Sequence, residues 1–248
     1  MTSFDAYLIG LVNQLVGRSW TLDTGLALLQ KTNLMTAELL VSAYWWAWFR
    51  REEAATRPRT RATLVVSLVG AVLAVGLALI VEQCLPPRPR PIHDSGLLLH
   101  RPLGLSPSDV HREWSSFPSD HAVMLFALVA GLFLVSRRVG AVAAIYTCVV
   151  TAVPRIYLGL HYPTDVIGGA ILGGAVVVSF NVPAVRNAIA GPVLALSTRN
   201  PAIFYAVSFL ITLQTGALFI DIPPIARWSI TVASALVHGP SAVTAGGP

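Results

Sequence analysis

Residues 62–81 read ATLVVSLVGAVLAVGLALIV, a run of twenty positions without a charged side chain. An α-helix needs about 20 apolar residues to cross roughly 30 Å of hydrocarbon, so this segment predicts a membrane-spanning helix. The composition agrees, because 54% of the 248 residues are hydrophobic and only 12% are charged. That charged share is about half of the value typical of soluble domains. The chain is therefore predicted to be a polytopic membrane protein.

Five further runs are also apolar, apart from Glu38 in the first of them. They occupy residues 33–49, 122–136, 139–154, 166–185 and 201–220. Together with 62–81 they predict an all-α membrane bundle of about six spanning helices, two of them short. No linker or composition shift divides the chain, so we expect one domain over residues 1–248 with a motif-bearing core at about 62–182.

The first residues predict an amphipathic helix. Apolar residues recur at helical spacing from Phe4 to Val16, with Asp5, Asn13 and Gln14 between them. Such a helix either lies in the membrane interface or packs against the bundle. No basic stretch precedes an apolar segment and no small-residue cleavage site follows, so we do not expect a cleavable signal.

The formal net charge of +5 is carried mostly by arginines at the ends of the apolar runs. They form neither a basic stripe nor a patch with interleaved aromatic residues, so we expect no nucleic-acid partner. Three short loops are rich in arginine, at residues 50–61, 137–138 and 186–199, and the positive-inside rule assigns them to the cytoplasm. The loops 83–118 and 155–161 are then expected at the outer face of a bacterial cytoplasmic membrane.

Two local patterns add detail to this architecture. Gly169 and Gly173 form a GxxxG pattern, which lets a neighbouring helix approach closely. Ser106 and Pro107 predict a short helix that runs to about Trp114 within the longest polar loop.

The two cysteines fall in a loop and in an apolar run, so we expect free thiols and neither a metal site nor a cofactor.

Three polar clusters stand at the edges of apolar runs, on the same predicted face of the bundle. They read RPRP at residues 88–91, FPSDH at 117–121 and RIYLGLHYPTD at 155–165. Ionisable groups at the membrane boundary cost several kcal/mol when they are unpaired. Their gathering at one face therefore calls for partners or a ligand.

The residue types in these clusters suit a phosphate group. Arg90 and Arg155 offer planar forks of donors that match phosphate geometry. The hydroxyl of Ser119 adds a donor beside a predicted helix start, where the free N–H groups of Asp120 and His121 can bind an anion. The clusters thus predict a phosphate-binding site.

Phosphoryl transfer further needs a nucleophile and an acid for the leaving oxygen. His161 is followed by Asp165 four residues later, so we expect this carboxylate to hold the Nδ1–H of the ring and leave Nε2 free to attack phosphorus. His121 then remains as the acid for the leaving group and as the base that activates water.

The three clusters resemble the signature of the type 2 phosphatidic acid phosphatase superfamily, which also includes the vanadium haloperoxidases. That signature reads K-x6-R-P, then P-S-G-H, then S-R-x5-H-x3-D, and the match spans about residues 83–165 in order and internal spacing. The resemblance implies an all-helical, metal-independent phosphatase that forms a phosphohistidine. It places the nucleophile, its orienting aspartate, the acid/base and the phosphate ligands at His161, Asp165, His121, Arg90, Ser119 and Arg155.

Three positions depart from the family pattern. Gln83 stands where the family has lysine, Asp120 replaces a glycine, and Pro154 replaces a serine. Gln83 can still donate a hydrogen bond, and Arg88 can supply charge to the phosphate. The FPSDH form and the glutamine resemble bacterial undecaprenyl diphosphate phosphatases more than the phosphatidylglycerophosphate or phosphatidic acid enzymes.

The leading hypothesis is a membrane lipid phosphatase that converts a polyprenyl (undecaprenyl) diphosphate to the monophosphate and phosphate. One alternative is a phosphatase or phosphotransferase acting on phosphatidylglycerophosphate, phosphatidic acid or lipid A. A small anion transporter is the alternative from another class, and it predicts ionisable residues spread through the depth of several helices. The sequence does not predict an oligomeric state.

Overall fold

The computed structural model of the chain describes residues 2–32, 34–103 and 115–216, and within these ranges all regular elements are helical. The α-helices are α1 (Ser3–Asn13), α2 (Trp20–Lys31), α3 (Leu39–Phe49), α4 (Arg57–Cys84), α5 (Asp120–Val135), α6 (Arg137–Thr147), α7 (Val153–Tyr157), α8 (Pro163–Phe180), α9 (Pro183–Arg199) and α10 (Pro201–Gly216). Three short turns join them, η1 (Leu34–Glu38), η2 (Pro91–His93) and η4 (Cys148–Ala152). The short helix predicted at 106–114 lies outside the described residues.

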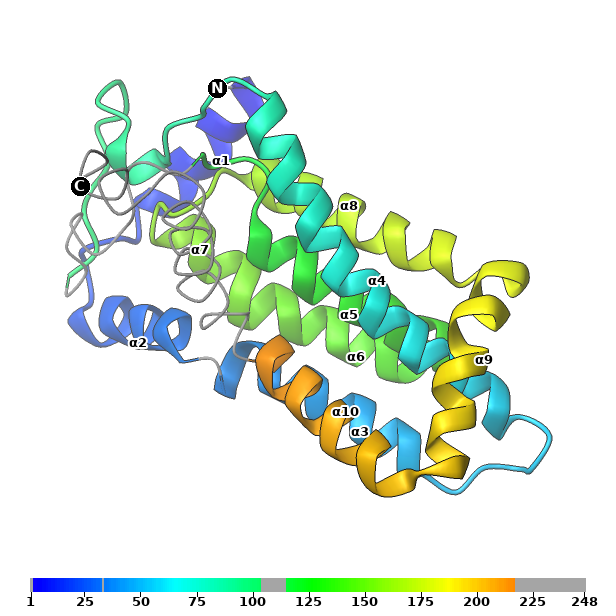
Figure 1. Cartoon of the computed structure of the whole chain (residues 1–248). Helices are drawn as coiled ribbons and strands as arrows, with labels where there is room; N and C mark the ends of the chain where they lie inside the picture. Colours follow the sequence, from blue (N-terminus) through cyan, green and yellow to red (C-terminus); the bar gives the residue numbers. More distant parts are fainter. Residues whose placement is uncertain (1, 33, 104–114, 217–248) are drawn as a thin grey trace, which may run out of the picture.

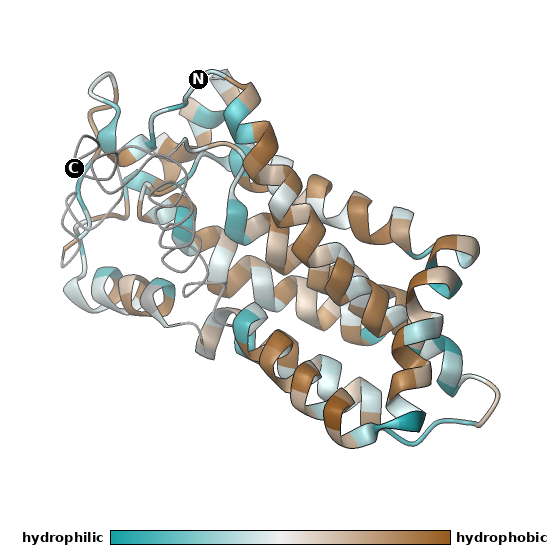
Figure 2. Cartoon of the chain, in the orientation of Figure 1, coloured by the Kyte–Doolittle hydropathy of each residue, from teal (hydrophilic) through white to brown (hydrophobic). Residues whose placement is uncertain are grey.

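The chain is a membrane helical bundle. Three helical segments are long and apolar enough to cross a bilayer, namely α4, the continuous stretch Arg137–Tyr157, and α8. Helices α5 and α10 are shorter apolar helices, and residues 34–49 of the run at 33–49 form η1 and α3. Hydrophobic residues line the length of the bundle while polar residues gather at its ends (Figure 2). Of the six predicted spans, three therefore correspond to helical segments that are long enough to cross a bilayer on their own.

The prediction of a loop at residues 186–199 is wrong. This stretch belongs to α9, which links the end of α8 to the start of α10 across one end of the bundle (Figure 1). Pro183 stands in the first turn of α9, where its missing N–H costs nothing and its fixed φ favours a helix. The arginines at the two ends of this segment suggested a loop, but the alanine, leucine and valine residues between them are compatible with a helix.

Helix α1 has the amphipathic pattern expected from the sequence, and it packs against the bundle. Asp5 and Ile9 are buried on its inner side, which lies against α7 and α8 (Figure 1). Tyr7 is 70% exposed and Leu11 is 51% exposed on its outer side. The apolar side of α1 therefore faces outward, as expected of a helix beside lipid, while a carboxylate faces the protein.

The closest helix packing in the core joins α5 to α8. A Cβ atom at Gly173 would overlap the carbonyl oxygen of Val123, and one at Gly169 would lie 2.7 Å from the carbonyl oxygen of Ser119. The GxxxG pattern therefore serves to bring two backbones into contact. Because Gly169 meets the start of α5 and Gly173 meets its next turn, the two helices run parallel and begin at the same end of the bundle.

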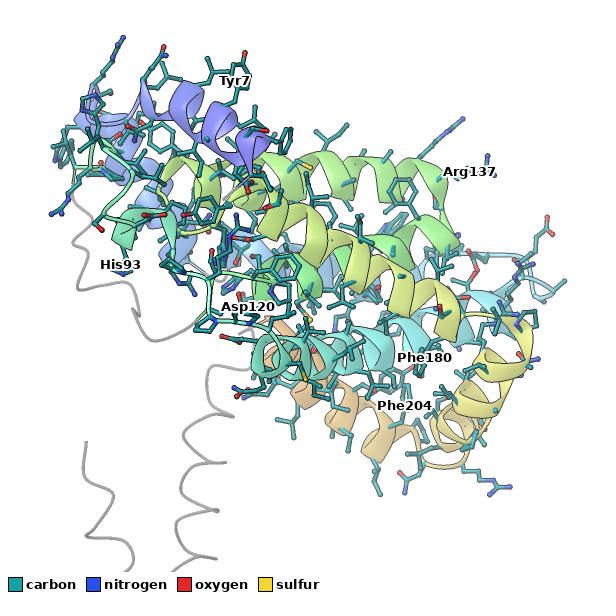
Figure 3. All side chains as sticks on the ribbon, turned by 90° about the horizontal axis from the view of Figure 1, so that it is seen from above. Tyr7, His93, Asp120, Arg137, Phe180 and Phe204 are labelled. Carbon is teal, nitrogen blue, oxygen red and sulfur yellow. The ribbon has the colours of Figure 1, made fainter. Side chains whose placement is uncertain are left out.

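The two ends of the bundle carry different parts of the sequence. Arg137 and Phe180 lie at one end, and His93 and Asp120 lie at the other (Figure 3). The arginine-rich connection before α4 shares the first end with α9 (Figure 1). The three polar clusters of the sequence gather at the opposite end, as predicted.

The packing of α8 on α5 predicts different effects of alanine at two adjacent glycines. Gly173→Ala forces a methyl group against the backbone of Val123, so we expect a loss of about 1–3 kcal/mol and a lower thermal midpoint in detergent, by about 3–10 °C. Gly174→Ala is the matched control, because a Cβ atom there meets nothing within 4 Å, and it should keep or raise the midpoint. Equal losses in the two variants would contradict this packing.

Candidate active site

The starts of α5 and α8 are bonded to each other. The backbone N–H of Ser119, just before α5, donates to the carbonyl oxygen of Asp165 at 3.2 Å. In α8 the Asp165 carboxylate accepts the N–H of Tyr162 at 2.7 Å, and Pro163 fills the first helical position. The second and third sequence clusters are therefore held together by the backbone, and two helix N-termini meet at one place.

His161 is a buried histidine with one nitrogen free of protons. Its side chain is 1% exposed, and Nδ1 lies 2.9 Å from the carbonyl oxygen of Ser116. A carbonyl oxygen only accepts, so Nδ1 carries the ring proton and Nε2 keeps its lone pair. Burial, together with the charges of Arg155 and Arg90, holds the pKa of His161 well below its usual value. The ring is therefore neutral at neutral pH, with Nε2 lying 3.2 Å from Nη1 of Arg90.

Asp165 reaches this ring through a neighbour, not directly as the sequence suggested. Its Oδ2 lies 3.9 Å from Nδ1 of His161, beyond hydrogen-bonding distance. The hydroxyl of Ser116 donates to Oδ2 of Asp165, and the carbonyl of Ser116 accepts from His161. The carboxylate is held away from the ring because it also closes the first turn of α8. Sequence reasoning missed Ser116, whose only signal is a hydroxyl two residues before the proline of FPSDH.

Three of the predicted phosphate ligands carry unused donors. Within the described residues, Nε of Arg90, Nε of Arg155 and Oγ of Ser119 are buried without a hydrogen-bond partner. Buried polar groups are nearly always paired in proteins, and the charges of both arginines act on the ring of His161. Two guanidinium groups and a hydroxyl near a neutral imidazole can hold a tetrahedral oxyanion next to its Nε2.

His121 is the more open of the two histidines. Its side chain is 25% exposed, and Nδ1 lies 2.9 Å from Oδ1 of Asp120. The same carboxylate oxygen accepts the backbone N–H of His121 at 2.8 Å. Because a carboxylate accepts, Nδ1 is protonated here too, and Nε2 is left to exchange protons with water or a substrate. Asp120, expected at the phosphate through its N–H, thus presents a carboxylate to His121.

Arg88 uses three of its five guanidinium donors within the protein. It donates to Asp5 at 2.7 Å, to Thr164 at 2.9 Å and to Asp165. Its guanidinium also lies over the ring of Tyr162, 4.0 Å from the ring centre. Two buried carboxylates therefore share its charge, and the geometry gives no support to the expected contact between Arg88 and a phosphate.

Gln83 lies apart from the cluster. Its side chain is exposed near the end of α4, and it makes no hydrogen bond to another described residue. The neighbouring Glu82 turns inward instead and accepts the N–H of Ser115 at 2.9 Å. The geometry thus gives no support to the predicted contact between Gln83 and a phosphate.

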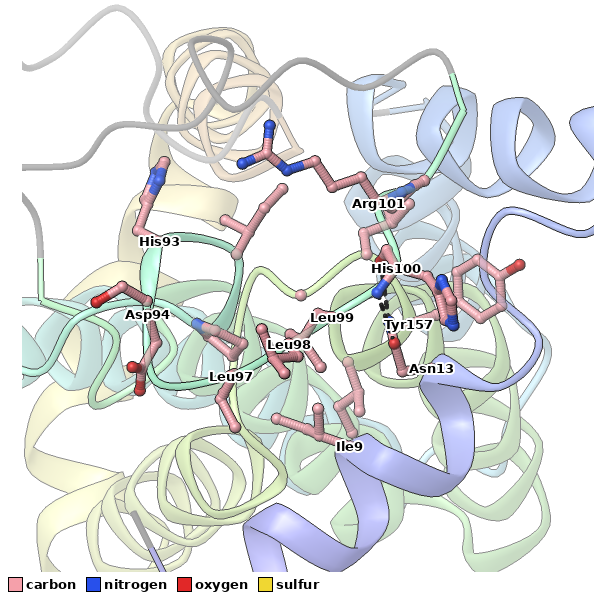
Figure 4. A pocket seen from close by; sticks show the side chains of 17 residues that line it. Ile9, Asn13, His93, Asp94, Leu97, Leu98, Leu99, His100, Arg101 and Tyr157 are labelled. Carbon is pink, nitrogen blue, oxygen red and sulfur yellow. Dashed lines mark hydrogen bonds between the residues drawn. The ribbon is translucent and has the colours of Figure 1, made fainter.

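A cavity of about 480 Å³ opens beside the cluster, between α1, residues 91–102 and residues 156–159 (Figure 4). Asn13 closes one side of it, with an amide that bonds the backbone of His100 at 2.9 and 2.7 Å. None of the nine predicted site side chains lines this cavity. The oxyanion site and the cavity are therefore distinct features of the same end of the bundle.

The unused donors predict where an oxyanion binds. Arg155→Gln removes a buried guanidinium, so we expect orthovanadate to bind at least about tenfold more weakly, as is usual for a lost charge-assisted hydrogen bond. Isothermal titration calorimetry in detergent measures the change. Arg101→Gln is the control, because Arg101 is exposed at the cavity, and it should bind within about twofold of wild type. An equal loss in both variants would place the anion elsewhere.

The chain is similar to known proteins. The family model for the PAP2 superfamily matches residues 62–187. The chain is 33% identical over 70 residues to undecaprenyl-diphosphatase BcrC of Bacillus subtilis (28% of this chain and 35% of that one). It is 34% identical over 87 residues to lipid A 1-phosphatase of Rhizobium etli (35% of each chain). It is 32% identical over 120 residues to decaprenylphosphoryl-5-phosphoribose phosphatase of Mycobacterium tuberculosis (48% of this chain and 60% of that one).

These alignments span between about a third and three fifths of the length of the curated relatives. No solved structure matches the chain significantly. The family match, in contrast, covers just over half of the chain and contains every motif residue of the site. It begins in α4 and ends in α9, so it includes the packed pair α5 and α8. The chain belongs to the PAP2 superfamily.

Proposed function

We propose that this protein is a membrane lipid phosphatase that hydrolyses a polyprenyl diphosphate through a phosphohistidine at His161. The observation that carries the proposal is the state of this ring. It is buried and neutral, its Nδ1–H is held by the carbonyl of Ser116, and its bare Nε2 lies beside Arg90. An imidazole in that state is a nucleophile, and the neighbouring guanidinium groups can hold the nonbridging oxygens of the phosphorus that it attacks.

The reaction takes two steps. In the first, Nε2 of His161 forms a bond to the terminal phosphorus, and the bond from phosphorus to the bridging oxygen breaks. The leaving lipid monophosphate takes the electron pair and a proton from Nε2 of protonated His121. In the second step His121 accepts a proton from water, whose oxygen bonds to phosphorus. The phosphorus–nitrogen bond breaks, its electron pair returns to His161, and inorganic phosphate leaves.

The contact between Asp120 and His121 supports the proposed roles of His121 as acid in the first step and base in the second. A carboxylate on Nδ1–H fixes the tautomer of the ring and stabilises the imidazolium that forms in each cycle. The 25% exposure of His121 lets water reach it, whereas His161 is 1% exposed. The nucleophile is thus shielded from solvent, and the acid/base is accessible to it.

A lipid can reach this site from the side of the bundle. The site lies where α5 and α8 begin, and exposed aliphatic side chains cover the outer faces of α4 and α8 below it. The lipid tail then stays in hydrocarbon while its phosphate meets Arg90 and Arg155. The arginine-rich loops lie at the other end of the bundle, so the positive-inside rule turns the site toward the outer side of a bacterial cytoplasmic membrane.

Two observations favour a polyprenyl diphosphate among lipid phosphates. The FPSDH form of the second motif resembles bacterial undecaprenyl diphosphate phosphatases, and two of the three relatives above carry a polyprenyl group in their names. The lipid A 1-phosphatase among them keeps lipid A as the second candidate. An anion transporter is less well supported, because the ionisable side chains of the three motif clusters gather at one end of the bundle instead of following a path through it.

Phosphate release from a lipid panel tests the proposal. Purified protein in detergent with EDTA is offered undecaprenyl diphosphate, lipid A, phosphatidylglycerophosphate and phosphatidic acid at equal mole fraction. We expect the fastest release from undecaprenyl diphosphate and no loss of rate with EDTA, because the described site supplies its cations from arginine. A His161→Ala preparation sets the background from contaminating enzymes. Release from none of the lipids by folded protein would refute the proposal, and a different preferred lipid would refute the substrate.

A further inference from the structure

Helix α1 lies outside the region that matches the PAP2 superfamily, yet it is bonded to the start of α8. The carboxylate of Asp5, in the first turn of α1, is 0% exposed. It accepts the backbone N–H of Thr164 at 3.0 Å and the hydroxyl of Thr164 at 2.8 Å. Burial opposes its ionisation, but these bonds and one from Arg88 outweigh burial and lower the pKa of Asp5. The carboxylate is therefore charged at neutral pH.

Arg88 joins Asp5 to Asp165. One terminal nitrogen donates to Asp5 at 2.7 Å, and the other donates to Asp165. Both carboxylates are fully buried, and two such charges would repel each other without a shared cation. The planar guanidinium also fixes their positions relative to each other. Without Asp5, one arm of Arg88 would be left unpaired, and its hold on Asp165 would loosen.

Ser116 carries this arrangement to the imidazole. Its N–H donates to the carbonyl oxygen of Arg88 at 2.8 Å, and its hydroxyl donates to Asp165. Its own carbonyl is the acceptor for Nδ1–H of His161 at 2.9 Å. The position of that carbonyl, and with it the orientation of the ring, therefore depends on both members of the Arg88–Asp165 pair.

We propose that Asp5 is a positioning residue for His161. Acting through Arg88, Asp165 and Ser116, it holds the ring in the tautomer with Nδ1 protonated and keeps Nε2 directed at the substrate. Helix α1 is then part of the catalytic assembly as well as a helix beside lipid. The kinetic consequence rests on the proposed phosphatase function, whereas the state of the ring does not depend on the substrate.

Asp23 offers a matched control within the same N-terminal segment. Its carboxylate is also 0% exposed, and it accepts from the hydroxyl of Tyr157 at 2.5 Å, the N–H of Gly17 at 3.0 Å and the N–H of Leu103 at 2.8 Å. It ties α2 to α7, and within the described residues it makes no hydrogen bond to Arg88, Asp165 or Ser116. Asp23→Asn therefore removes a buried charge of the same kind without touching the path to His161.

The test compares Asp5→Asn with Asp23→Asn by two measurements. The first is the ring tautomer of His161 by NMR of the full chain labelled with ¹⁵N-histidine, the signal being assigned by its loss in His161→Gln. The second is kcat and KM for undecaprenyl diphosphate. We expect Asp5→Asn to populate the tautomer protonated at Nε2 and to lower kcat by about 10–100-fold with KM nearly unchanged, as for a misplaced reacting group. Asp23→Asn should lower the thermal midpoint but keep the wild-type tautomer and kcat.

A double variant tests whether the effect travels along this path. Asp5→Asn combined with Ser116→Ala should lose no more kcat than the worse single variant, because both break the same connection. If Asp5→Asn does not fold, Thr164→Val takes its place, because it removes only the hydroxyl that bonds both Asp5 and Arg88. It should shift the tautomer in the same direction and lower kcat by about 3–10-fold. An unchanged tautomer and kcat in the variant that folds would overturn the inference, as would independent losses in the double variant. Failure of the proposed function would look different, because wild type itself would release no phosphate while its tautomer stayed measurable.

Discussion

The close approach of α8 to α5 at Gly169 and Gly173 is the constraint on which the site depends. No side chain separates the two backbones there, so the helices pack closely. They run parallel, and their first turns lie side by side. The N–H of Ser119 can then bond the carbonyl of Asp165. His161, just before α8, and His121, in the first turn of α5, are brought to one place. Two residues without side chains thus position the two residues proposed to carry the chemistry.

The arginines around this site divide into two groups with different tasks. Arg90 and Arg155 keep unused donors and lower the proton affinity of His161, so they suit an arriving anion. Arg88 is paired with two carboxylates and holds protein to protein. Arg88 and Arg90 are two residues apart, but their side chains have different partners. Arg88 donates to Asp5 and Asp165, whereas Arg90 donates to the carbonyl oxygen of Leu160 and lies beside His161.

The membrane-spanning helices and the gathering of the three motif clusters at one end of the bundle could be predicted from the sequence. Apolar runs such as 62–81 predict membrane-spanning helices, because hydrocarbon excludes charged side chains. Motif residues at the ends of such helices lie at the same membrane face when the loops that carry them do. The roles of Asp5 and Ser116 could not be predicted, because their bonds join residues 83 and 49 positions apart and leave no local pattern. The spacing of His161 and Asp165 suggested a direct bond, but closing the first turn of α8 takes priority for that carboxylate.

The central claim is that His161 becomes phosphorylated, and trapping the phosphoenzyme tests it most directly. Protein mixed with undecaprenyl diphosphate labelled in its terminal phosphate is quenched within milliseconds, and protein-bound label is measured under alkaline conditions, where phosphohistidine persists. We expect a transient label in wild type, a slower rise and slower decay in His121→Ala, and no label in His161→Ala. Wild-type labelling or turnover in His161→Ala would contradict it.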